Sequence, residues 1–202
     1  MTAITAEDVA GACRRALAAA AAAEDELNAA DAALGDGDTG QTMRRVAEKV
    51  AAAADPLLPL GRLFRKLGMA ATEATGSSLG TLVAIGLMAM GKSLGDTGST
   101  DTAGIASALE AAEAAMLARG GASLGDKTAL DMLHAVRTAL AASDGTDADE
   151  AVRKAAAQTL AAFRDRRCRI GRARIFAERS VGRDDPGMLA FARLVEACTS
   201  AG

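Results

Sequence analysis

Apolar residues recur along this chain at the spacing of helices. Met43, Val46 and Val50 lie three or four positions apart, as on one face of a helix, and Asp55-Pro56 follows them as a stop signal. Capping residues and glycine clusters mark the other boundaries. Together these signals predict about eight helices, over Thr5–Asn28, Gln41–Ala54, Pro59–Ala70, Ser78–Met90, Thr102–Arg119, Thr128–Ala142, Asp149–Arg166 and Pro186–Ser200.

The connections between the predicted helices are short, so consecutive helices are expected to pack as antiparallel neighbours. Half of the 202 residues are hydrophobic and only 2% are aromatic. Alanine is abundant and β-branched runs are scarce, which favours closely packed helices over sheet. We therefore expect a single all-α domain over residues 1–202, a closed antiparallel barrel or bundle. Alternate turns of such an array meet at one end, which brings together residues 31–40, 76–78, 120–128 and 172–187.

Composition also limits the partners. A net charge of −3 and the scarcity of stacking aromatic residues argue against nucleic acid. Cys13, Cys168 and Cys198 are far apart and lack metal-ligand spacing, so we interpret them as buried small hydrophobic residues of a reducing cytosol. The amino terminus has no basic signal segment, and Ala16–Ala23 is too short and too weakly apolar to span a membrane. A cytoplasmic protein that acts on small molecules or protein partners is expected.

Three carboxylates crowd into the glycine-rich turn between the first two predicted helices. Asp31, Asp36 and Asp38 would repel one another unless a cation lay between them, and hard divalent metals such as Mg²⁺ take carboxylate oxygens. Glycine lets the backbone bend until neighbouring carboxylates converge. A solvated turn followed by a helix cap is the alternative. A calcium-binding EF-hand is excluded, because its sixth and twelfth positions would hold Gln41 and Ala47.

The segment Gly86–Ser93 matches the phosphate-binding P-loop pattern G-x-x-x-x-G-K-S. A P-loop continues directly into a helix, whereas loop residues follow this segment, and the chain lacks the alternating strands and helices of that fold. We predict instead a buried helix that ends at Gly91, with Lys92 near its carboxyl end, where a cation is favoured. The only histidine, His134, lies within a predicted helix and is expected to be structural.

Three further motifs belong to the same predicted end. Gly76–Ser78 and Gly125–Thr128 each precede a helix, so each is either a plain helix cap or an anion site at a helix amino terminus. Residues 164–183 hold eight arginines, which by default would form a solvated face. Glycines at positions 171, 182 and 187 favour a mobile loop there instead.

In order and spacing, these motifs resemble the nucleotide-binding L subunit, or DhaL-type subunit, of dihydroxyacetone kinases over nearly the whole chain. The resemblance rests on Asp31 with Gly35–Asp38, on Gly76–Ser78, on Gly125–Asp131 and on Gly171–Gly187. It implies a closed barrel of eight antiparallel helices with the nucleotide at one end. This agrees with the helix count reached from caps and apolar faces.

The resemblance also implies a cofactor set and partners. Asp31, Asp36 and Asp38 would hold two Mg²⁺ ions that bridge the phosphates of ATP or ADP. The guanidinium group of Arg172 would donate hydrogen bonds to two phosphate oxygens. A separate K-type subunit would hold dihydroxyacetone or a related keto-sugar. Some relatives keep ADP bound and are recharged by a phosphocarrier of the phosphotransferase system. Further implied nucleotide contacts are Thr39, Gly40, Gln41, Thr42, Ser77, Ser78, Gly120, Asp185, Pro186 and Gly187.

Three departures from the family pattern lie inside these motifs. The loop Thr75–Gly80 stands where the family usually has a Gly-Gly-Ala-Ser-Gly-Pro type sequence. Thr39 and Arg183 stand where the family usually has histidine. Arg183 places one more cation near the expected phosphates. Two other functions stay open: a non-catalytic nucleotide-binding regulatory module, and a kinase subunit for another acceptor such as a tetrulose. Because Asp31, Asp36 and Asp38 of the family pattern are present, a catalytic role is favoured over a purely regulatory one.

Overall fold

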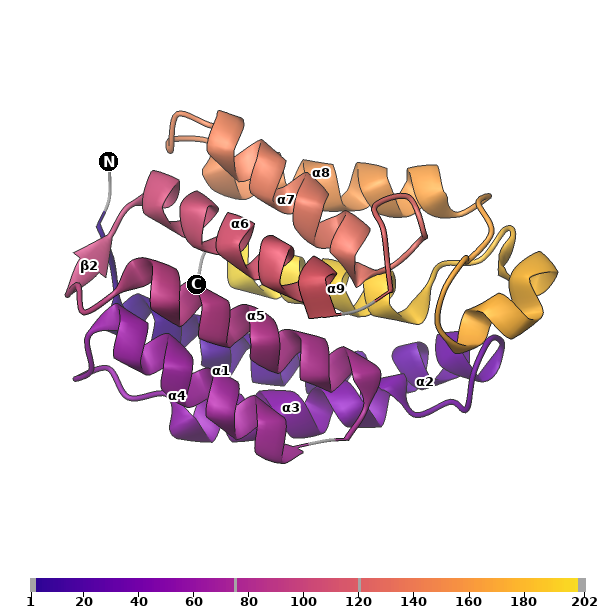
Figure 1. Ribbon diagram of the computed structural model, residues 1–202, viewed down its shortest axis with the longest axis horizontal. Coiled ribbons are helices and arrows are strands. Elements are labelled where there is room, and N and C mark those ends of the chain that lie inside the picture. The colour runs from indigo at the N-terminus through magenta and orange to yellow at the C-terminus, as the bar shows by residue number, and fades with distance from the viewer. Residues whose placement is uncertain (1–2, 75, 120, 200–202) are drawn as a thin grey trace.

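The computed structural model describes residues 3–74, 76–119 and 121–199, and it is almost entirely helical (Figure 1). The described part contains α1 (Ala6–Ala22), α2 (Glu24–Ala32), α3 (Thr39–Ala53), α4 (Leu60–Ala74), α5 (Ser78–Leu94), α6 (Thr102–Arg119), α7 (Ala129–Ala142), α8 (Ala148–Phe163) and α9 (Pro186–Thr199). A 3₁₀ helix, η1 (Arg172–Ser180), precedes α9, and two short strands, β1 (Ile4–Thr5) and β2 (Ser99–Thr100), pair with each other. The predicted all-α class is confirmed.

Local capping signals explain several helix boundaries. Thr5 and Asp8 form a reciprocal capping box at the start of α1, and Thr128 and Asp131 form another at the start of α7. The hydroxyl of Ser77 caps α5. Such side chains satisfy the first N–H groups of a helix, which have no carbonyl partner within it.

The first predicted helix is in fact two helices. It breaks at Ala23, between the end of α1 and the start of α2, and neither glycine nor proline marks the break. Glu24, Asp25 and Glu26 fill the first turn of α2, where the partial positive charge of a helix N-terminus favours acidic side chains. A new helix start at this point is therefore electrostatically favourable.

Two other local predictions are corrected. α5 does not end at Gly91; it continues to Leu94 and stops at Gly95, whose φ of 61° is a left-handed conformation that glycine adopts without strain. Residues 172–180, predicted as loop, form η1. The two short strands were also not predicted.

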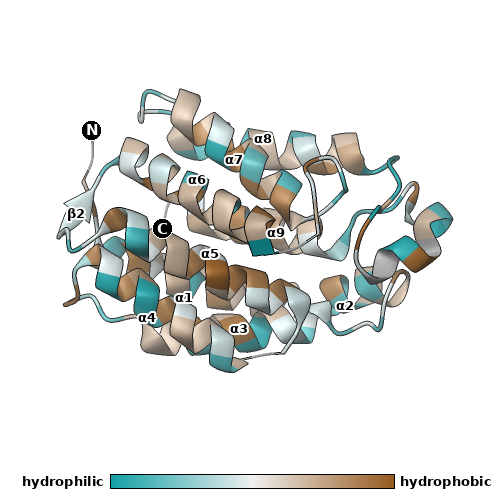
Figure 2. Ribbon diagram, viewed as in Figure 1, coloured by the Kyte–Doolittle hydropathy of each residue, from teal (hydrophilic) through white to brown (hydrophobic). Residues whose placement is uncertain are grey.

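The helices close into a ring. Each helix from α3 to α9 packs against the next one along the chain, and α9 returns to pack against α1, which packs against α3. Hydrophobic stretches lie along the helices of the barrel, α5 among them, and many of the connecting turns are hydrophilic (Figure 2). The largest core cluster joins α1, α4, α5, α6 and α7 through residues that include Cys13, Leu63, Met90, Met116 and Leu133.

The alternating directions of the helices give the barrel two different ends. α3, α5, α7 and α9 all begin at the right-hand end of Figure 1, where α2, α4, α6 and α8 finish. The opposite end carries the strand pair, with Ile4 opposite Thr100 and Thr5 opposite Ser99. The turns after α2, α4, α6 and α8 are therefore neighbours, as expected from counting alternate turns.

The histidine and cysteines take part in packing. His134 Nδ1 lies 2.8 Å from Oε1 of Glu113, which joins α7 to α6. Cys13 and Cys168 are buried as predicted, whereas Cys198 is exposed, contrary to prediction. Within the described ranges, no helix has both the length and the apolar character that crossing a bilayer requires.

Candidate functional site

A cavity of about 960 Å³ opens at the end of the barrel where α3, α5, α7 and α9 begin. Its wall includes the first turns of these four helices, the last turns of α2 and α6, and residues 170–171. Most of the residues expected to form the site lie in this wall. They are Asp31, Asp36, Asp38, Thr39, Thr42, Ser77, Ser78, Asp185, Pro186 and Gly187.

Four helix N-termini thus face one cavity. Each carries a partial positive charge of about half an elementary charge and N–H groups that have no partner within the helix. The arginine side chains Arg45 and Arg119 also line the wall and add full positive charges. This arrangement favours an anion with several charged oxygens, such as a chain of phosphates.

On one side of the cavity the three predicted aspartates converge. One carboxylate oxygen from each of Asp31, Asp36 and Asp38 lies within 4.8 Å of the other two. Asp31 is buried, while Asp36 and Asp38 are exposed. Oxygens at this spacing are a suitable donor set for a hard divalent cation such as Mg²⁺. The cluster therefore fits the predicted metal.

The backbone of the turn is folded around Asp31. Its Oδ2 accepts the N–H of Asp38 at 2.9 Å and that of Thr39 at 3.2 Å, so the end of α2 holds the start of α3. Gly35 passes so close to Asp31 that a Cβ there would clash with Oδ1. Asp38 precedes α3, yet its side chain makes no capping hydrogen bond. The alternative of a simple helix cap therefore does not describe Asp38.

Asn28 supports this wall without lining the cavity, and its role was missed from the sequence. Its Oδ1 accepts the N–H of Gly40 at 2.8 Å and that of Gln41 at 3.2 Å. Gly40 packs against α2 so tightly that a Cβ would clash with the carbonyl of Glu24. The available signal was the spacing of Asn28 and Asp31, three positions apart on one helix face.

Gly40 and Gln41 therefore contact α2 through their amides, and neither lines the cavity. Their predicted contacts with nucleotide stay predictions. Gly120 lies outside the described residues. Arg172 begins η1, directly after Ile170 and Gly171 of the cavity wall, and its side chain is not among those described.

Asp185 and the start of α9 form another part of the cavity wall. Its Oδ1 accepts the N–H of Met188 at 2.9 Å, which caps the helix. Burial raises the pKa of Asp185 to about 6, the nearby Asp131 acts in the same direction, and hydrogen bonds from Met188 and Gly187 partly oppose the shift. A carboxyl group with this pKa changes charge near physiological pH.

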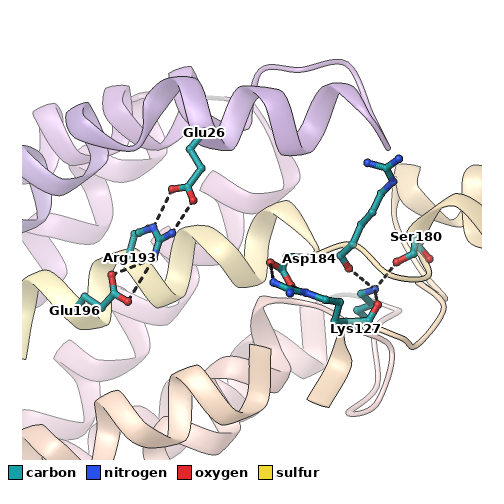
Figure 3. A network of polar contacts seen from close by, with 8 residues as sticks. Glu26, Lys127, Ser180, Asp184, Arg193 and Glu196 are labelled. Carbon is teal, nitrogen blue, oxygen red and sulfur yellow. Dashed lines mark hydrogen bonds and ion pairs between the residues drawn. The ribbon is translucent and has the colours of Figure 1, made fainter. Parts of the chain in front are cut away.

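Lys127, in the turn between α6 and α7, is the second group that the sequence did not reveal. Only 1% of its surface is exposed. Its Nζ donates to four backbone carbonyls, at 2.9 Å to Arg164, 2.8 Å to Arg166, 2.6 Å to Ser180 and 2.8 Å to Arg183. Figure 3 shows the contact with Ser180. The motif had been interpreted as a cap or an anion site, whereas its lysine binds carbonyl groups of the chain itself.

The backbone of Lys127 is as unusual as its side chain. Its φ is 66°, and it is the only non-glycine residue in the described part with a positive φ. That conformation costs a residue with a side chain about 1–2 kcal/mol. Burial lowers the pKa of Lys127, and nearby acidic groups that include Asp185 and Asp184 partly offset this. Lys127 is thus buried and has an unfavourable backbone conformation. This indicates that its four hydrogen bonds to carbonyls contribute to the structure.

An ion pair fixes α9 against α2 (Figure 3). Arg193 Nε and Nη2 donate to the two carboxylate oxygens of Glu26, at 2.9 and 2.6 Å. Arg193 Nη1 also reaches Glu196 on its own helix, at 3.2 Å. Because Asp31 ends α2 and Pro186 begins α9, this pair holds two walls of the cavity at a fixed distance.

The P-loop-like segment lies away from this site. Lys92 is exposed in the last turn of α5, a helix of 17 residues whose first turn lines the cavity. The two ends of such a helix are about 25 Å apart. The prediction of a helix in place of a P-loop is confirmed, although the helix continues past the predicted end at Gly91 to Leu94.

The fold and the site define an antiparallel helical barrel domain in which an acidic cluster shares one cavity with four helix N-termini, a combination suited to a metal together with a polyanion. The chain belongs to the DAK2 domain family, whose model matches residues 33–200. This confirms the resemblance to the L subunit of dihydroxyacetone kinases.

Several proteins of known activity are similar to this chain. L-erythrulose 1-kinase of Mycolicibacterium smegmatis is 35% identical over 181 residues, which cover 86% of this chain and 32% of that protein. The ADP-binding subunit DhaL of PEP-dependent dihydroxyacetone kinase 1 of Listeria innocua is 32% identical and covers 85% of this chain and 84% of that protein. This chain thus spans about a third of the first relative and most of the second.

A solved structure has the same architecture. The dihydroxyacetone kinase of C. freundii, crystallised in complex with AMP-PNP and Mg²⁺, is 31% identical to this chain. The match has a TM-score of 0.74 and covers 94% of this chain and 33% of that one. At this identity and coverage, the likeness supports the fold over nearly the whole chain.

Proposed function

We propose that this chain is the nucleotide-binding, phosphoryl-transfer component of a cytoplasmic kinase for dihydroxyacetone or a related keto-sugar. The observation that carries the proposal is the single cavity in which Asp31, Asp36 and Asp38 face four helix N-termini. Carboxylates alone would repel the phosphates of a nucleotide. Helix N-termini alone could bind a free anion, and such a site would have no use for carboxylates. The two features together suit phosphates that bind with divalent cations.

Asp31, Asp36 and Asp38 would hold two Mg²⁺ ions. When bound, Mg²⁺ would neutralise charge on the phosphates and polarise the group that is transferred. The N–H groups at the starts of α5 and α9 would bind the remaining phosphate oxygens, and Arg172 would contact two of them at once. Phosphoryl transfer depends mainly on such positioning and charge stabilisation, so no covalent intermediate on this chain is required.

The acceptor would come from a separate K-type subunit. Dihydroxyacetone is one candidate, supported by the Listeria relative named as a dihydroxyacetone kinase subunit. A tetrulose is the other, because two of the most similar relatives are an L-erythrulose 1-kinase and a D-erythrulose kinase, 35% and 36% identical to this chain. Phosphorylation of both sugars by the mixture of the two subunits would be compared directly.

The donor would be either free ATP or a phosphocarrier that recharges bound ADP. The rate at which radiolabelled ADP leaves the purified chain separates them: fast exchange supports ATP as donor, and slow exchange supports a phosphocarrier. A non-catalytic ADP-binding regulatory module is the second candidate function. The exposed carboxylates of Asp36 and Asp38 in the cavity favour catalysis over that role.

Calorimetry tests the proposal. ADP should bind tightly with Mg²⁺ and weakly when the metal is chelated, because three carboxylates and the phosphates repel one another without it. Asp36→Asn should weaken the binding that depends on Mg²⁺. Asp25→Asn is its matched control, since Asp25 is an exposed carboxylate on the same helix as Asp31 and lies outside the cluster. Equal affinity with and without Mg²⁺ would refute the metal-dependent site.

A coupled assay tests the division of labour. With ATP and dihydroxyacetone, turnover should appear only after a K-type subunit is added, and Asp38→Ala should abolish it. Turnover by this chain alone would contradict the two-component mechanism. Nucleotide binding without turnover in any mixture would favour the regulatory module.

A further inference from the structure

Residues 164–183, here called the strap, are twenty of the twenty-two residues that connect α8 to α9, and part of the strap lines the cavity. All four carbonyls that bind Lys127 belong to it: Arg164 and Arg166 lie at its start, and Ser180 and Arg183 lie at its end. One ammonium group therefore joins the two ends of the strap.

The chemistry of the contact is well matched. An ammonium has three N–H donors and no acceptor, so four converging carbonyl oxygens leave none of its donors unsatisfied. Arg164 directly follows α8, and Ser180 is the last residue of η1. Carbonyls at helix C-termini carry partial negative charge, which complements the cation. Lys127 thus acts as a shared C-terminal cap for two helices.

The same lysine stands between three walls of the cavity. The next residues along the chain, Thr128 to Leu130, form the first turn of α7 and line the cavity. Within the strap, Ile170 and Gly171 line it, and Asp185–Gly187 line it directly after the strap ends. Lys127 itself is not part of the lining.

We propose that Lys127 is a positioning residue for nucleotide binding: by holding both ends of the strap, it sets the places of residues 170–171 and of the start of α9 against the phosphates. This proposal rests on the proposed function. It does not extend to the metal, because the aspartate cluster is held by α2 and α3 through contacts that do not involve the strap.

Other contacts keep the strap folded when the lysine is changed. The N–H of Cys168 donates to Ser180 Oγ at 2.8 Å, the N–H of Gly182 donates to the carbonyl of Arg164 at 3.0 Å, and the N–H of Arg169 donates to the carbonyl of Asp126 at 3.1 Å. Removing the ammonium should therefore loosen the base of the strap without unfolding the barrel.

Two substitutions of Lys127 separate the clamp from the turn. Lys127→Met keeps the length of the side chain and removes the charge. Lys127→Gly removes the side chain and suits the left-handed backbone without strain. If Lys127 served only as a turn residue, Lys127→Gly would bind nucleotide as well as the unchanged chain does. If the clamp is required, both variants should bind poorly.

Two control substitutions are available. Lys92→Met makes the same chemical change at an exposed position at the far end of α5. Arg164→Met removes the ion pair with Asp184, whose nearest oxygen lies 2.7 Å away, but leaves the Arg164 carbonyl that Lys127 binds. Both controls should retain nucleotide affinity within about twofold, because surface ion pairs contribute little.

Three measurements on the whole chain decide the question. In Lys127→Met and Lys127→Gly, hydrogen exchange without nucleotide should accelerate in residues 164–183 and not in α4 or α5. Calorimetry with Mg²⁺ and ADP should show a loss of affinity of about tenfold to a hundredfold, as expected when binding groups shift by about 1 Å. Mn²⁺ binding without nucleotide, followed by electron paramagnetic resonance, should stay within about twofold.

The outcomes separate this inference from the proposed function. Loss of Mn²⁺ binding together with nucleotide binding would mean general damage and overturn the positioning role. Normal ADP affinity in Lys127→Gly, or unchanged exchange in the strap, would also overturn it. Failure of the unchanged chain to bind Mg²⁺ and ADP would instead refute the proposed function, and the exchange measurement on the strap would still test the clamp.

Discussion

Two regions of the cavity wall are held in place by buried side chains of opposite charge. The aspartate wall contains Asp31, Asp36 and Asp38, and the lysine wall, residues 170–171 and 185–187, is supported by Lys127 from outside the lining. Asp31 accepts two N–H groups from the start of α3, and Lys127 donates to four carbonyls at the ends of α8 and η1 and beside them. Each buried side chain binds backbone groups at or beside a helix terminus, where N–H and carbonyl groups lack partners within the helix. The negative wall thus organises helix starts, and the positive wall organises helix ends.

The two walls differ in how far apart their parts lie along the chain. Asp31 bonds residues seven and eight positions later. Lys127 bonds residues that are 37 to 56 positions later. The aspartate wall can therefore form from α2, its turn and α3 alone, whereas the lysine wall needs α7, α8 and α9 in place. We expect changes in the first wall to act locally and changes in the second to act at a distance.

The largest expected effect is on the chemistry of the aspartate wall. Asp36→Asn should weaken binding of ADP in the presence of Mg²⁺ by at least about a hundredfold, because it removes a charged metal ligand from a cluster of three. Its melting temperature should fall little, since Asp36 is exposed. Calorimetry and thermal unfolding of the same sample measure both quantities. A variant that binds normally would place the metal elsewhere.

Gly40→Ala tests how tightly α3 is packed against α2. A Cβ at this position would clash with the carbonyl of Glu24, so the free energy of unfolding should fall by about 2–3 kcal/mol. Gly98→Ala is the control, because a Cβ there would have no neighbour within 4 Å. Denaturant unfolding of both variants gives the comparison, and equal stability would contradict the close approach.

Asp185→Asn tests the lysine wall through pH. The folded-state pKa of Asp185, about 6, exceeds its ordinary value of 3.8, so the native chain binds the proton more tightly than the unfolded chain does. Ionisation of Asp185 therefore lowers stability as pH rises through this interval. Asparagine keeps a capping oxygen and cannot ionise.

Relative to the unchanged chain, Asp185→Asn should gain about 2 kcal/mol of stability between pH 4.5 and pH 7. Urea unfolding at both pH values measures this difference. If the stability difference between Asp185→Asn and the unchanged chain were the same at both pH values, burial would not raise the pKa of Asp185.

The smallest expected effect belongs to Asn28. Asn28→Ala leaves the amides of Gly40 and Gln41 without their acceptor and should cost about 1 kcal/mol of stability, as the loss of a helix cap does. Asn28→Asp keeps an acceptor oxygen and should cost less. Chemical unfolding of the pair checks the order, and the reverse order would show that the oxygen is not what matters.

The helices and the aspartate cluster could be predicted because their determinants are local. The capping residues Thr5, Ser77 and Thr128 lie next to the helices that they begin, and glycines accompany the three aspartates of one turn. Spacing alone was enough to indicate a metal. The break at Ala23 was missed because only a run of acidic residues marks it.

The strand pair and the lysine clamp could not be predicted in this way. Ile4 pairs with Thr100, and nothing in either short segment indicates the other. The carbonyls that bind Lys127 are backbone atoms, and every residue has one, so no residue type in the strap reveals them. The left-handed φ of Lys127 is likewise a property of the folded chain, at a position where sequence rules expect glycine.

The alternation of helix directions has a practical consequence for protein engineering. The connections at the end of the barrel opposite the cavity contribute no residue to the cavity wall. Residues 143–147, between α7 and α8, are one of them. Thr146 and Asp147 are exposed there. A reporter domain or an affinity tag inserted between them would have its ends anchored on solvent-facing backbone, the kind of site where insertions are tolerated. The barrel thus has an insertion site at the end away from the cavity, where an added domain would not contact the proposed nucleotide site.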